Sequence, residues 1–354
     1  MNKKIVFTGG GTAGHVTPNI ALLPFLQKEG FDAYYIGSYN GIEKRLIEDF
    51  DIPYYGISTG KFRRYFDLKN LSDPFRVIKG YSQAVKILKE LKPDIVFSKG
   101  GFVSVPVVRA AASLKIPCII HESDMTPGLA NKLCIPVATK VCCNFPETMK
   151  YVPSGKAMLT GSPIRMELTT GSKLAALELC GFTANKPVIM VIGGSQGAAS
   201  VNIMVREALP KLLEDFQVVH ICGKDKVDNL MLNVPGYKQF EYLKSDLKDV
   251  FAMADVVVSR AGANAICELL ALKKPNLLIP LQMGSRGDQI LNARSFEEQG
   301  FSMAVREDFI DCDILTDKIH ELYENRQTYI DKMCESNQIN SIPTIVELIK
   351  ECCK

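Results

Sequence analysis

The chain has 354 residues, of which 47% are hydrophobic and 23% charged, and its formal net charge is +3. This composition is typical of a globular protein with two domains and excludes a disordered chain, while the small charge gives no reason to expect a nucleic-acid partner. Apolar runs stay below the ~18 residues of a membrane-spanning helix, and Met1–Lys4 leads directly into a short strand, so we expect neither a membrane span nor a signal peptide.

The 11 cysteines include no Cys-x-x-Cys pair. An odd number of cysteines in a long chain without a signal peptide is typical of reduced, mostly buried thiols in the cytosol. We therefore expect free thiols and no metal site.

Short apolar runs alternate with helical patterns along most of the chain, which predicts an α/β protein with two doubly wound, Rossmann-like domains. In the first half the predicted strands are Ile5–Thr8, Ala33–Gly37, Tyr54–Ile57, Ile95–Ser98, Cys118–His121, Val141–Asn144 and Met158–Thr160. In the second half they are Val188–Ile192, Val218–Cys222, Gln239–Tyr242, Asp255–Ser259, Asn276–Pro280 and Met303–Val305.

Between these strands, Asp73–Pro74 predicts the start of a long helix that ends at Leu91. The Gly161–Arg165 segment predicts the hinge between the two domains.

The domain boundaries follow from this hinge. We expect a first domain over residues 1–162 and a second over residues 163–340. Residues 341–354 are expected to form an amphipathic helix that packs back on the first domain.

A glycine-rich turn follows the first strand of each half. The first turn is Gly9–Gly14, after Ile5–Phe7, and the second is Gly193–Ala198, after Val188–Ile192. A glycine-rich turn at a helix N-terminus presents backbone N–H groups to an anion. Two such turns predict two similar domains that face one another across a cleft, which suits an enzyme that joins an activated sugar to a second substrate.

The first turn also fits the Gly-x-Gly-x-x-Gly fingerprint of dinucleotide-binding domains. A dinucleotide site requires an acidic residue at the end of the second strand, where this chain has Tyr35–Ser38. The absence of an acid disfavours a nicotinamide cofactor.

His15 follows the first turn, at or just before the start of the next helix. A helix N-terminus disfavours a charged imidazole, so we expect His15 to be neutral near pH 7 and able to accept a proton. Two further polar segments, Gly100–Ser104 and His121–Asp124, end strands of the same predicted sheet. Together with His15 they predict a pocket for an anionic substrate at the carboxyl edge of this sheet.

Two segments of the second half carry further candidate residues. In Arg260–Glu268, the carboxylate of Glu268 is placed about a turn and a half inside a helix, where it could hold the two hydroxyls of a ribose. In Arg286–Asn292, Gln289 and Asn292 share one helix face and could hydrogen-bond sugar hydroxyls.

Taken in order, these motifs resemble the MurG family of glycosyltransferases, which belongs to glycosyltransferase family 28 and has the GT-B fold. The family transfers N-acetylglucosamine from UDP-N-acetylglucosamine to undecaprenyl-diphospho-muramoyl-pentapeptide (lipid I), which gives lipid II in peptidoglycan synthesis. The resemblance covers nearly the whole chain. It is carried by Gly10–His15, Gly100–Ser104, His121–Glu122, Asn131–Lys132, Gly161–Arg165, Gly193–Ala198, Gly262–Ala263, Glu268, Gln289 and Asn292.

The resemblance implies that the second domain binds the donor and that the first domain binds the acceptor diphosphate. The implied donor-binding residues are Thr12, Gly14, Arg165, Ser195, Gln196, Ala263, Glu268, Asp288, Gln289 and Asn292. The implied acceptor-binding residues are Gly11, Gly14, Gly101, Ser104, His121, Asp124 and Asn131.

Three departures from the family pattern concern these positions. Many relatives read His-Glu-Gln-Asn where this chain has His121–Asp124, so a carboxylate replaces an amide. Ala265 stands where a threonine often helps to bind the donor. Arg286–Gly287 carries a one-residue insertion, which makes the register of Asp288 less certain than that of Gln289.

For such an enzyme the reaction is a single displacement with inversion at the anomeric carbon. A base takes the proton from the 4-hydroxyl of the acceptor as UDP leaves, and we expect His15 in this role, with Glu122 as the second candidate. Fixed hydrogen-bond donors stabilise the departing UDP. We expect no cofactor, and no divalent metal requirement for binding.

A lipid-linked acceptor implies peripheral association with the cytoplasmic face of a bacterial membrane. Lys61–Phe66 mixes bases with aromatic residues and precedes a helix start with apolar residues, which suits an anionic lipid surface, although the same segment could be a loop packed on the first domain. The candidate membrane residues are Phe62, Arg63, Arg64 and Phe75.

The expected partners are UDP-N-acetylglucosamine, lipid I, an anionic membrane and a cell-wall synthesis complex. The alternatives are a UDP-N-acetylglucosamine 2-epimerase, another GT-B lipid glycosyltransferase that acts on diacylglycerol, and a non-enzymatic UDP-sugar sensor. An epimerase needs no lipid acceptor, and a sensor has no need of His15 beside its cleft.

Overall fold

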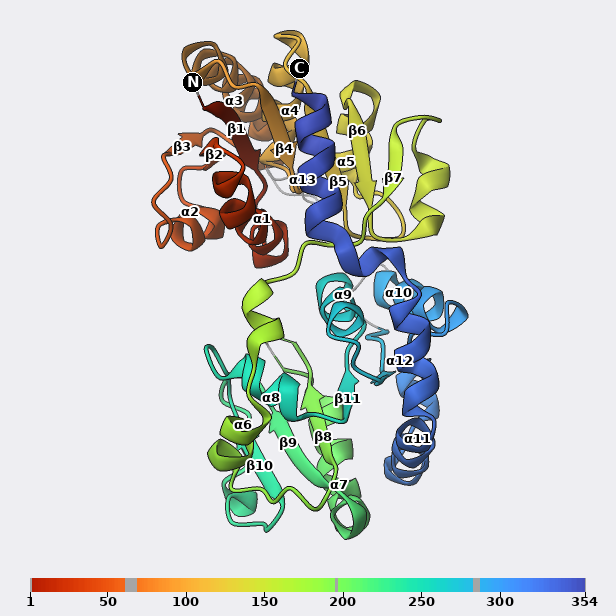
Figure 1. Ribbon diagram of the computed structural model, residues 1–354. Helices are drawn as coiled ribbons and strands as arrows, with labels where there is room; N and C mark the ends of the chain where they lie inside the picture. Colours follow the sequence, from red (N-terminus) through yellow and green to blue (C-terminus); the bar gives the residue numbers. More distant parts are fainter. Residues whose placement is uncertain (1, 61–68, 195–196, 283–286, 354) are drawn as a thin grey trace. The chain divides into compact units, whose positions relative to one another are not determined.

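The computed structural model of the chain describes residues 2–60, 69–194, 197–282 and 287–353. The chain divides into two compact units. The first is Met1–Arg165 together with Asn340–Lys354, and the second is Met166–Ile339. Each unit is built on a parallel sheet covered by helices (Figure 1).

A seven-stranded sheet forms the centre of the first unit. Its strands are β1 (Lys3–Thr8), β2 (Phe31–Ser38), β3 (Tyr54–Ile57), β4 (Ile95–Ser98), β5 (Cys118–Glu122), β6 (Lys140–Cys143) and β7 (Ala157–Leu159). They lie in the order β3-β2-β1-β4-β5-β6-β7, and all neighbouring strands are parallel. Successive strands are added on one side of β1 up to β3 and on the other side from β4 onward. Ligands of open α/β sheets bind at such a switch point, which here lies between β1 and β4.

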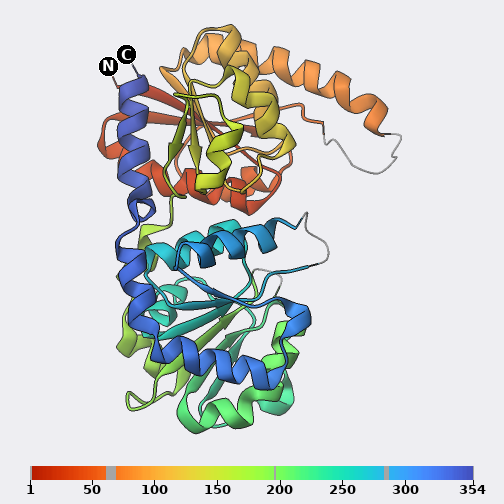
Figure 2. The ribbon, with the colours of Figure 1, turned by 90° about the vertical axis from the view of Figure 1, so that its right-hand side faces the viewer.

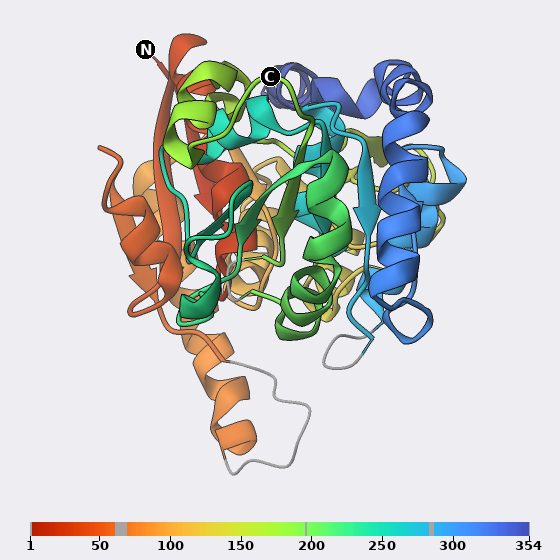
Figure 3. The same cartoon turned by 90° about the horizontal axis from the view of Figure 1, so that it is seen from below.

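Helices cover both faces of this sheet. They are α1 (Thr17–Lys28), α2 (Ile42–Ile47), α3 (Lys69–Leu91), α4 (Ser104–Ser113), α5 (Leu129–Cys134) and the C-terminal α13 (Ser341–Cys352). The N-terminal end of α3 extends beyond the rest of the first unit (Figures 2 and 3).

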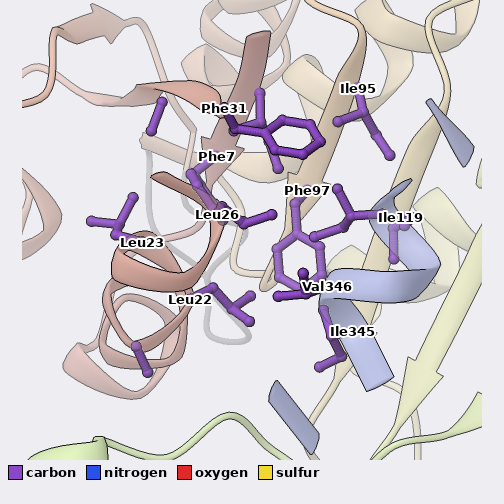
Figure 4. Close-up of a cluster of buried hydrophobic side chains, with 14 of the residues drawn as sticks. Phe7, Leu22, Leu23, Leu26, Phe31, Ile95, Phe97, Ile119, Ile345 and Val346 are labelled. Atoms are coloured by element: carbon purple, nitrogen blue, oxygen red, sulfur yellow. The ribbon is translucent and has the colours of Figure 1, made fainter. Parts of the chain in front are cut away.

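The C-terminal helix α13 belongs to the core of the first unit. Its apolar residues recur at helical spacing, and Ile345 is fully buried. Figure 4 shows Ile345 and Val346 beside Phe97 and Ile119 of the sheet. The C-terminal helix therefore covers one face of the sheet to which the N-terminal strand β1 belongs.

The second unit repeats the architecture with a six-stranded parallel sheet. Its strands are β8 (Val188–Ile192), β9 (Gln217–Ile221), β10 (Tyr237–Phe240), β11 (Val256–Ser259), β12 (Asn276–Leu278) and β13 (Met303–Ala304), in the order β10-β9-β8-β11-β12-β13. Its helices are α6 (Lys173–Cys180), α7 (Ala199–Asp215), α8 (Leu247–Met253), α9 (Ala263–Ala271), α10 (Asp288–Glu298), α11 (Cys312–Glu324) and α12 (Arg326–Cys334). Here the strand order reverses between β8 and β11.

All thirteen predicted strands are present, with ends that differ by up to two residues. The predicted start of α3 at Asp73–Pro74 was wrong. The helix begins at Lys69 and includes these two residues in its first two turns. The cysteines match the expectation: all are free thiols, and eight of the 11 are buried. No helix within the described ranges has the length and apolar character needed to cross a bilayer.

Candidate active site

The first glycine-rich turn lies at the switch point of the first sheet, directly after β1. A second turn, after β4, packs against it, and Gly10 N–H donates to the Gly100 carbonyl over 3.3 Å. Gly101 has a φ of +85°, and a Cβ on it would lie 2.2 Å from the Gly10 oxygen. Only glycine therefore lets these two turns approach so closely.

His15 lies at the end of a short 3-10 turn, Ala13–His15, two residues before α1. Its Nδ1 is 3.0 Å from the Gly10 carbonyl oxygen. Because a carbonyl only accepts, Nδ1 carries the proton in this contact and Nε2 keeps its lone pair. Burial lowers the pKa of His15, an effect that nearby Lys99 reinforces and that the Gly10 hydrogen bond and Glu43 oppose. The lowered pKa has the direction that the sequence predicts, and burial is its largest cause.

Glu43, on α2, is a functional candidate that the sequence did not reveal. Its side chain is 1% exposed. The carboxylate accepts the Gly11 N–H over 3.1 Å, the Ser38 N–H over 3.0 Å and the Ser38 hydroxyl. The Glu43 carboxylate therefore accepts one of the turn N–H groups that the sequence predicted to bind a substrate anion. Glycines leave room for this side chain: a Cβ on Gly41 would lie 2.1 Å from Glu43 Oε1, and a Cβ on Gly10 would lie 2.5 Å from Glu43 Cδ.

A cavity of about 780 Å³ adjoins the turn, and we call it the turn cavity. Gly11, Thr12, His15 and Gly101 contribute to its lining. Three of the residues predicted to contact the acceptor or the donor thus lie with His15 around one space.

His121 does not line this cavity, and its role as an acceptor ligand stays a prediction. The side chain is fully buried, its Nε2 lies 2.9 Å from the Gly161 carbonyl oxygen, and its Nδ1 lies 2.7 Å from Lys99 Nζ. Burial and the Lys99 charge hold the pKa of His121 well below its usual value. Both ring nitrogens therefore serve the protein interior, as does Lys99, which also contacts the Ser123 hydroxyl.

Glu122 and Asn131 organise the loop after β5. The Glu122 carboxylate, 4% exposed, accepts the N–H groups of Asp124 (2.9 Å) and Gly128 (3.0 Å) and the Asn131 amide (2.9 Å). Asn131 and the Ser104 hydroxyl, which donates to the Gly101 carbonyl, are buried as well. The acceptor roles of Ser104 and Asn131 stay predictions, and the three donors that engage Glu122 favour His15 over Glu122 as the base.

The glycine turn of the second unit follows β8. Gly197 has a φ of +68°, and a Cβ on it would lie 2.0 Å from the Cys222 carbonyl oxygen. Lys226 Nζ donates to the Gly197 carbonyl over 3.2 Å. Ser195 and Gln196 lie outside the described residues, so their donor contacts stay predictions.

Arg260, which follows β11, bonds to residues just beyond the ends of β12 and β13 and at the start of α7. Its guanidinium forms a two-pronged ion pair with Glu307, with N–O distances of 3.0 and 2.9 Å, and also donates to the Ile279 carbonyl and the Ser200 hydroxyl. Hydrogen bonding from Arg260 is the main cause that lowers the pKa of Glu307. Arg260 therefore stabilises the carboxyl edge of the second sheet.

The predicted donor residues differ in exposure. Glu268 is half-buried and occupies the predicted position inside α9. Asn292 is 1% exposed and donates to the Ala261 carbonyl over 3.1 Å, and its contact with the sugar stays a prediction. Gln289 is half-buried, and its amide oxygen accepts the Leu281 N–H over 3.0 Å. Both amides thus attach α10 to the carboxyl edge of the sheet.

The other predicted residues are placed as follows. Arg165 ends the first unit and is half-buried, and the half-buried donor candidates Ala263 and Asp288 begin α9 and α10. Gly14 and Asp124 are half-buried. The membrane candidates Phe62, Arg63 and Arg64 lie outside the described residues, whereas Phe75, on α3, is 74% exposed.

In the described ranges, no three His, Cys, Asp or Glu side chains are grouped as metal ligands would be. A neutral histidine beside a cavity in one unit and a glycine turn for an anion in the other are the parts that group transfer from a phosphorylated donor requires.

Comparison with known sequences agrees with both units. The pattern of the glycosyltransferase family 28 N-terminal domain matches residues 5–143, and the pattern of its C-terminal domain matches residues 188–349. The two matches fall on the sheets of the first and the second unit.

Individual relatives cover nearly the whole chain. It is 64% identical over 350 residues to the UDP-N-acetylglucosamine–N-acetylmuramyl-(pentapeptide) pyrophosphoryl-undecaprenol N-acetylglucosamine transferase of Lachnospira eligens, with 99% of each protein covered. The crystal structure of MurG from Acinetobacter baumannii superposes with a TM-score of 0.79 at 27% identity, covering 99% of each chain. A UDP-N-acetylglucosamine 2-epimerase from Neisseria meningitidis superposes with a TM-score of 0.67 at 16% identity over 99% of this chain and all of that chain, a likeness of fold alone.

Proposed function

Because the chain belongs to glycosyltransferase family 28, we propose that it transfers N-acetylglucosamine from UDP-N-acetylglucosamine to the 4-hydroxyl of undecaprenyl-diphospho-N-acetylmuramoyl-pentapeptide. The product is lipid II. The 64% identity to a transferase named for these substrates favours this reaction over epimerisation. Within the structure, the observation that carries the chemistry is the neutral His15, whose Nε2 retains its lone pair beside the turn cavity.

The proposed step is one displacement. His15 Nε2 accepts the proton of the acceptor hydroxyl as its oxygen forms a bond to the anomeric carbon, and the bond from that carbon to the UDP oxygen breaks. The electron pair leaves with UDP, so negative charge grows on the diphosphate. Positioned general-base catalysis of this kind contributes about 10²–10⁴-fold to the rate.

The glycine turn after β8 supplies the donor side of the proposal. The turn leads into α7, whose N-terminal N–H groups favour an anion, and Gly197 keeps the turn close to the β9 end. Fixed donors of this kind stabilise the charge on departing UDP without a resident metal. Activity that survives an excess of EDTA would support this part of the proposal, and activity restored only by Mg²⁺ would contradict it.

The test of the reaction is UDP release from UDP-N-acetylglucosamine with and without a short-chain lipid I analogue, with the sugar followed by mass spectrometry and NMR. The proposal predicts UDP release that depends on the acceptor and a disaccharide-lipid product. Conversion of the donor to its 2-epimer without an acceptor would move the chain to the epimerases.

The lipid acceptor places the reaction at a membrane, and α3 is the proposed contact. Phe75 and Ile78, one turn apart on α3, are 74% and 62% exposed. Both belong to the N-terminal half of α3, and the N-terminal end of this helix extends from the unit (Figure 2). Exposed apolar residues on a helix bind a bilayer surface reversibly, so we propose peripheral association with the cytoplasmic face of the membrane.

A further inference from the structure

The turn cavity extends beyond the residues that the transfer reaction uses. Besides His15 and its turn, its lining includes Tyr39, the segment Ser58–Gly60 after β3, and Arg76 of α3. In the sheet, β3 is the second neighbour of β1, so the C-terminal ends of these strands lie about 10 Å apart. The cavity therefore joins the region of the proposed base to a second polar region.

The second region is held in place by close contacts of α3. A Cβ on Gly80 would lie 2.1 Å from the Ser58 carbonyl oxygen, so the α3 backbone packs directly on the segment after β3. Gln83 of α3 accepts the Ser58 N–H over 2.8 Å and donates to the Tyr39 hydroxyl over 2.7 Å. Arg76 lies one turn before Gly80 on the same helix face, and this packing brings it to the cavity.

The charges along the cavity favour an anion near Arg76. Among the described residues of its lining, three have side chains that titrate near pH 7 or carry a charge there: His15, Glu43 and Arg76. Glu43 is buried and engaged by three donors of the protein, and His15 is neutral at pH 7. Arg76 is exposed and forms no ion pair with any described carboxylate. Its guanidinium can therefore bind a carboxylate of a ligand.

The chemistry of the acceptor suggests which anion this is. In an N-acetylmuramyl-pentapeptide the peptide is attached through a lactyl ether to O3, the oxygen next to the attacking O4. If O4 lies at His15, as the proposed function requires, the peptide begins beside His15, whereas the diphosphate leaves from the opposite side of the sugar ring. A distance of about 10 Å corresponds to about three extended residues. The cavity volume of about 780 Å³ also lies within the range of about 300–1,000 Å³ that is typical of ligand sites.

We propose that the turn cavity binds the peptide of the acceptor, and that Arg76 pairs with a peptide carboxylate within the first few residues. This inference rests on the proposed function and adds a subsite to it. The enzyme would thereby select acceptors by the charge of their peptide as well as by their sugar and diphosphate.

The test compares two water-soluble, short-chain acceptors, so that membrane binding plays no part. Both contain the diphosphate and the same peptide, but in one the peptide carboxylates are converted to neutral amides. We expect Arg76→Gln to lower kcat/KM for the charged acceptor about tenfold, which corresponds to about 1.4 kcal/mol. The neutral acceptor should be used equally by the variant and the unmodified enzyme, and KM for UDP-N-acetylglucosamine should not change.

The control is Lys79→Gln, which removes an exposed cation of α3 that does not line the cavity. It should leave both acceptors unaffected. Equal losses for both acceptors in Arg76→Gln would assign Arg76 to the diphosphate and overturn the peptide subsite, as would no loss at all. Failure of the unmodified enzyme to transfer sugar to either acceptor would instead overturn the proposed function, and the subsite with it.

Discussion

The buried carboxylate of Glu43 is predicted to hold the catalytic turn, and Glu43→Gln tests this directly. In the structure one carboxylate oxygen accepts the Gly11 N–H and the other accepts the Ser38 N–H. A glutamine has only one acceptor oxygen, so in either orientation its NH₂ group faces a backbone N–H. One buried donor then loses its partner, which costs about 1–3 kcal/mol, and the remaining bonds lose their charge assistance.

We therefore expect Glu43→Gln to destabilise the first unit by about 2–4 kcal/mol. For a unit of this size the melting temperature falls by about 2–4 °C per kcal/mol, a change that calorimetry measures. The variant should also move the acid limb of kcat/KM to lower pH, because the negative charge of Glu43 raises the pKa of His15. The matched control, Glu48→Gln, changes an exposed carboxylate at the end of the same helix and should alter stability by less than about 0.5 kcal/mol. A melting temperature and an acid limb that match the unmodified protein would refute the role assigned to Glu43.

Three further predictions concern packing, titration and the membrane. In calorimetry, Gly101→Ala should destabilise the first unit by more than Gly155→Ala. Both positions have positive φ, but only at position 101 would the new Cβ lie 2.2 Å from a carbonyl oxygen. Equal losses of stability would contradict the close approach of the two turns. Burial lowers the pKa of His220 to about 3, so its contribution to the stability of the second unit is fully present above pH 6.5 and falls by about 2 kcal/mol at pH 5. His220→Asn should remove this part of the pH dependence of the free energy of unfolding. An unchanged pH dependence in the variant would contradict the lowered pKa. Joint replacement of Phe75 and Ile78 by glutamate should weaken sedimentation with anionic vesicles while UDP-N-acetylglucosamine binding stays intact, and undiminished sedimentation would exclude α3 as the membrane contact.

Local sequence patterns were sufficient to predict the strands and the position of His15. Short apolar runs identify buried parallel strands, because both faces of such a strand lie in the core. The glycine turns identify the points where a strand meets a helix N-terminus, and His15 lies immediately after one of them.

The contacts of the polar candidates could not be predicted, because a sequence does not show what a polar side chain faces. His121 and Asn292 sit where a ligand could be bound, but each satisfies a buried carbonyl of the protein. The role of Glu43 could not be predicted, because its contact with Gly11 spans 32 residues and forms only when β2 and α2 fold beside the turn. Arg76 likewise reaches the turn cavity through the packing of α3 at Gly80.

The pH dependence of transfer by His15→Gln tests the central claim, that the neutral imidazole beside the glycine turn is the base. For the unmodified enzyme, kcat/KM with a lipid I analogue should fall at low pH with a midpoint below 6.5, because His15 must be unprotonated and its pKa is lowered. His15→Gln should reduce kcat/KM by about 10²–10⁴-fold and abolish this acid limb, with donor binding preserved. A variant that transfers the sugar at the rate of the unmodified enzyme, with the same acid limb, would show that another group removes the proton.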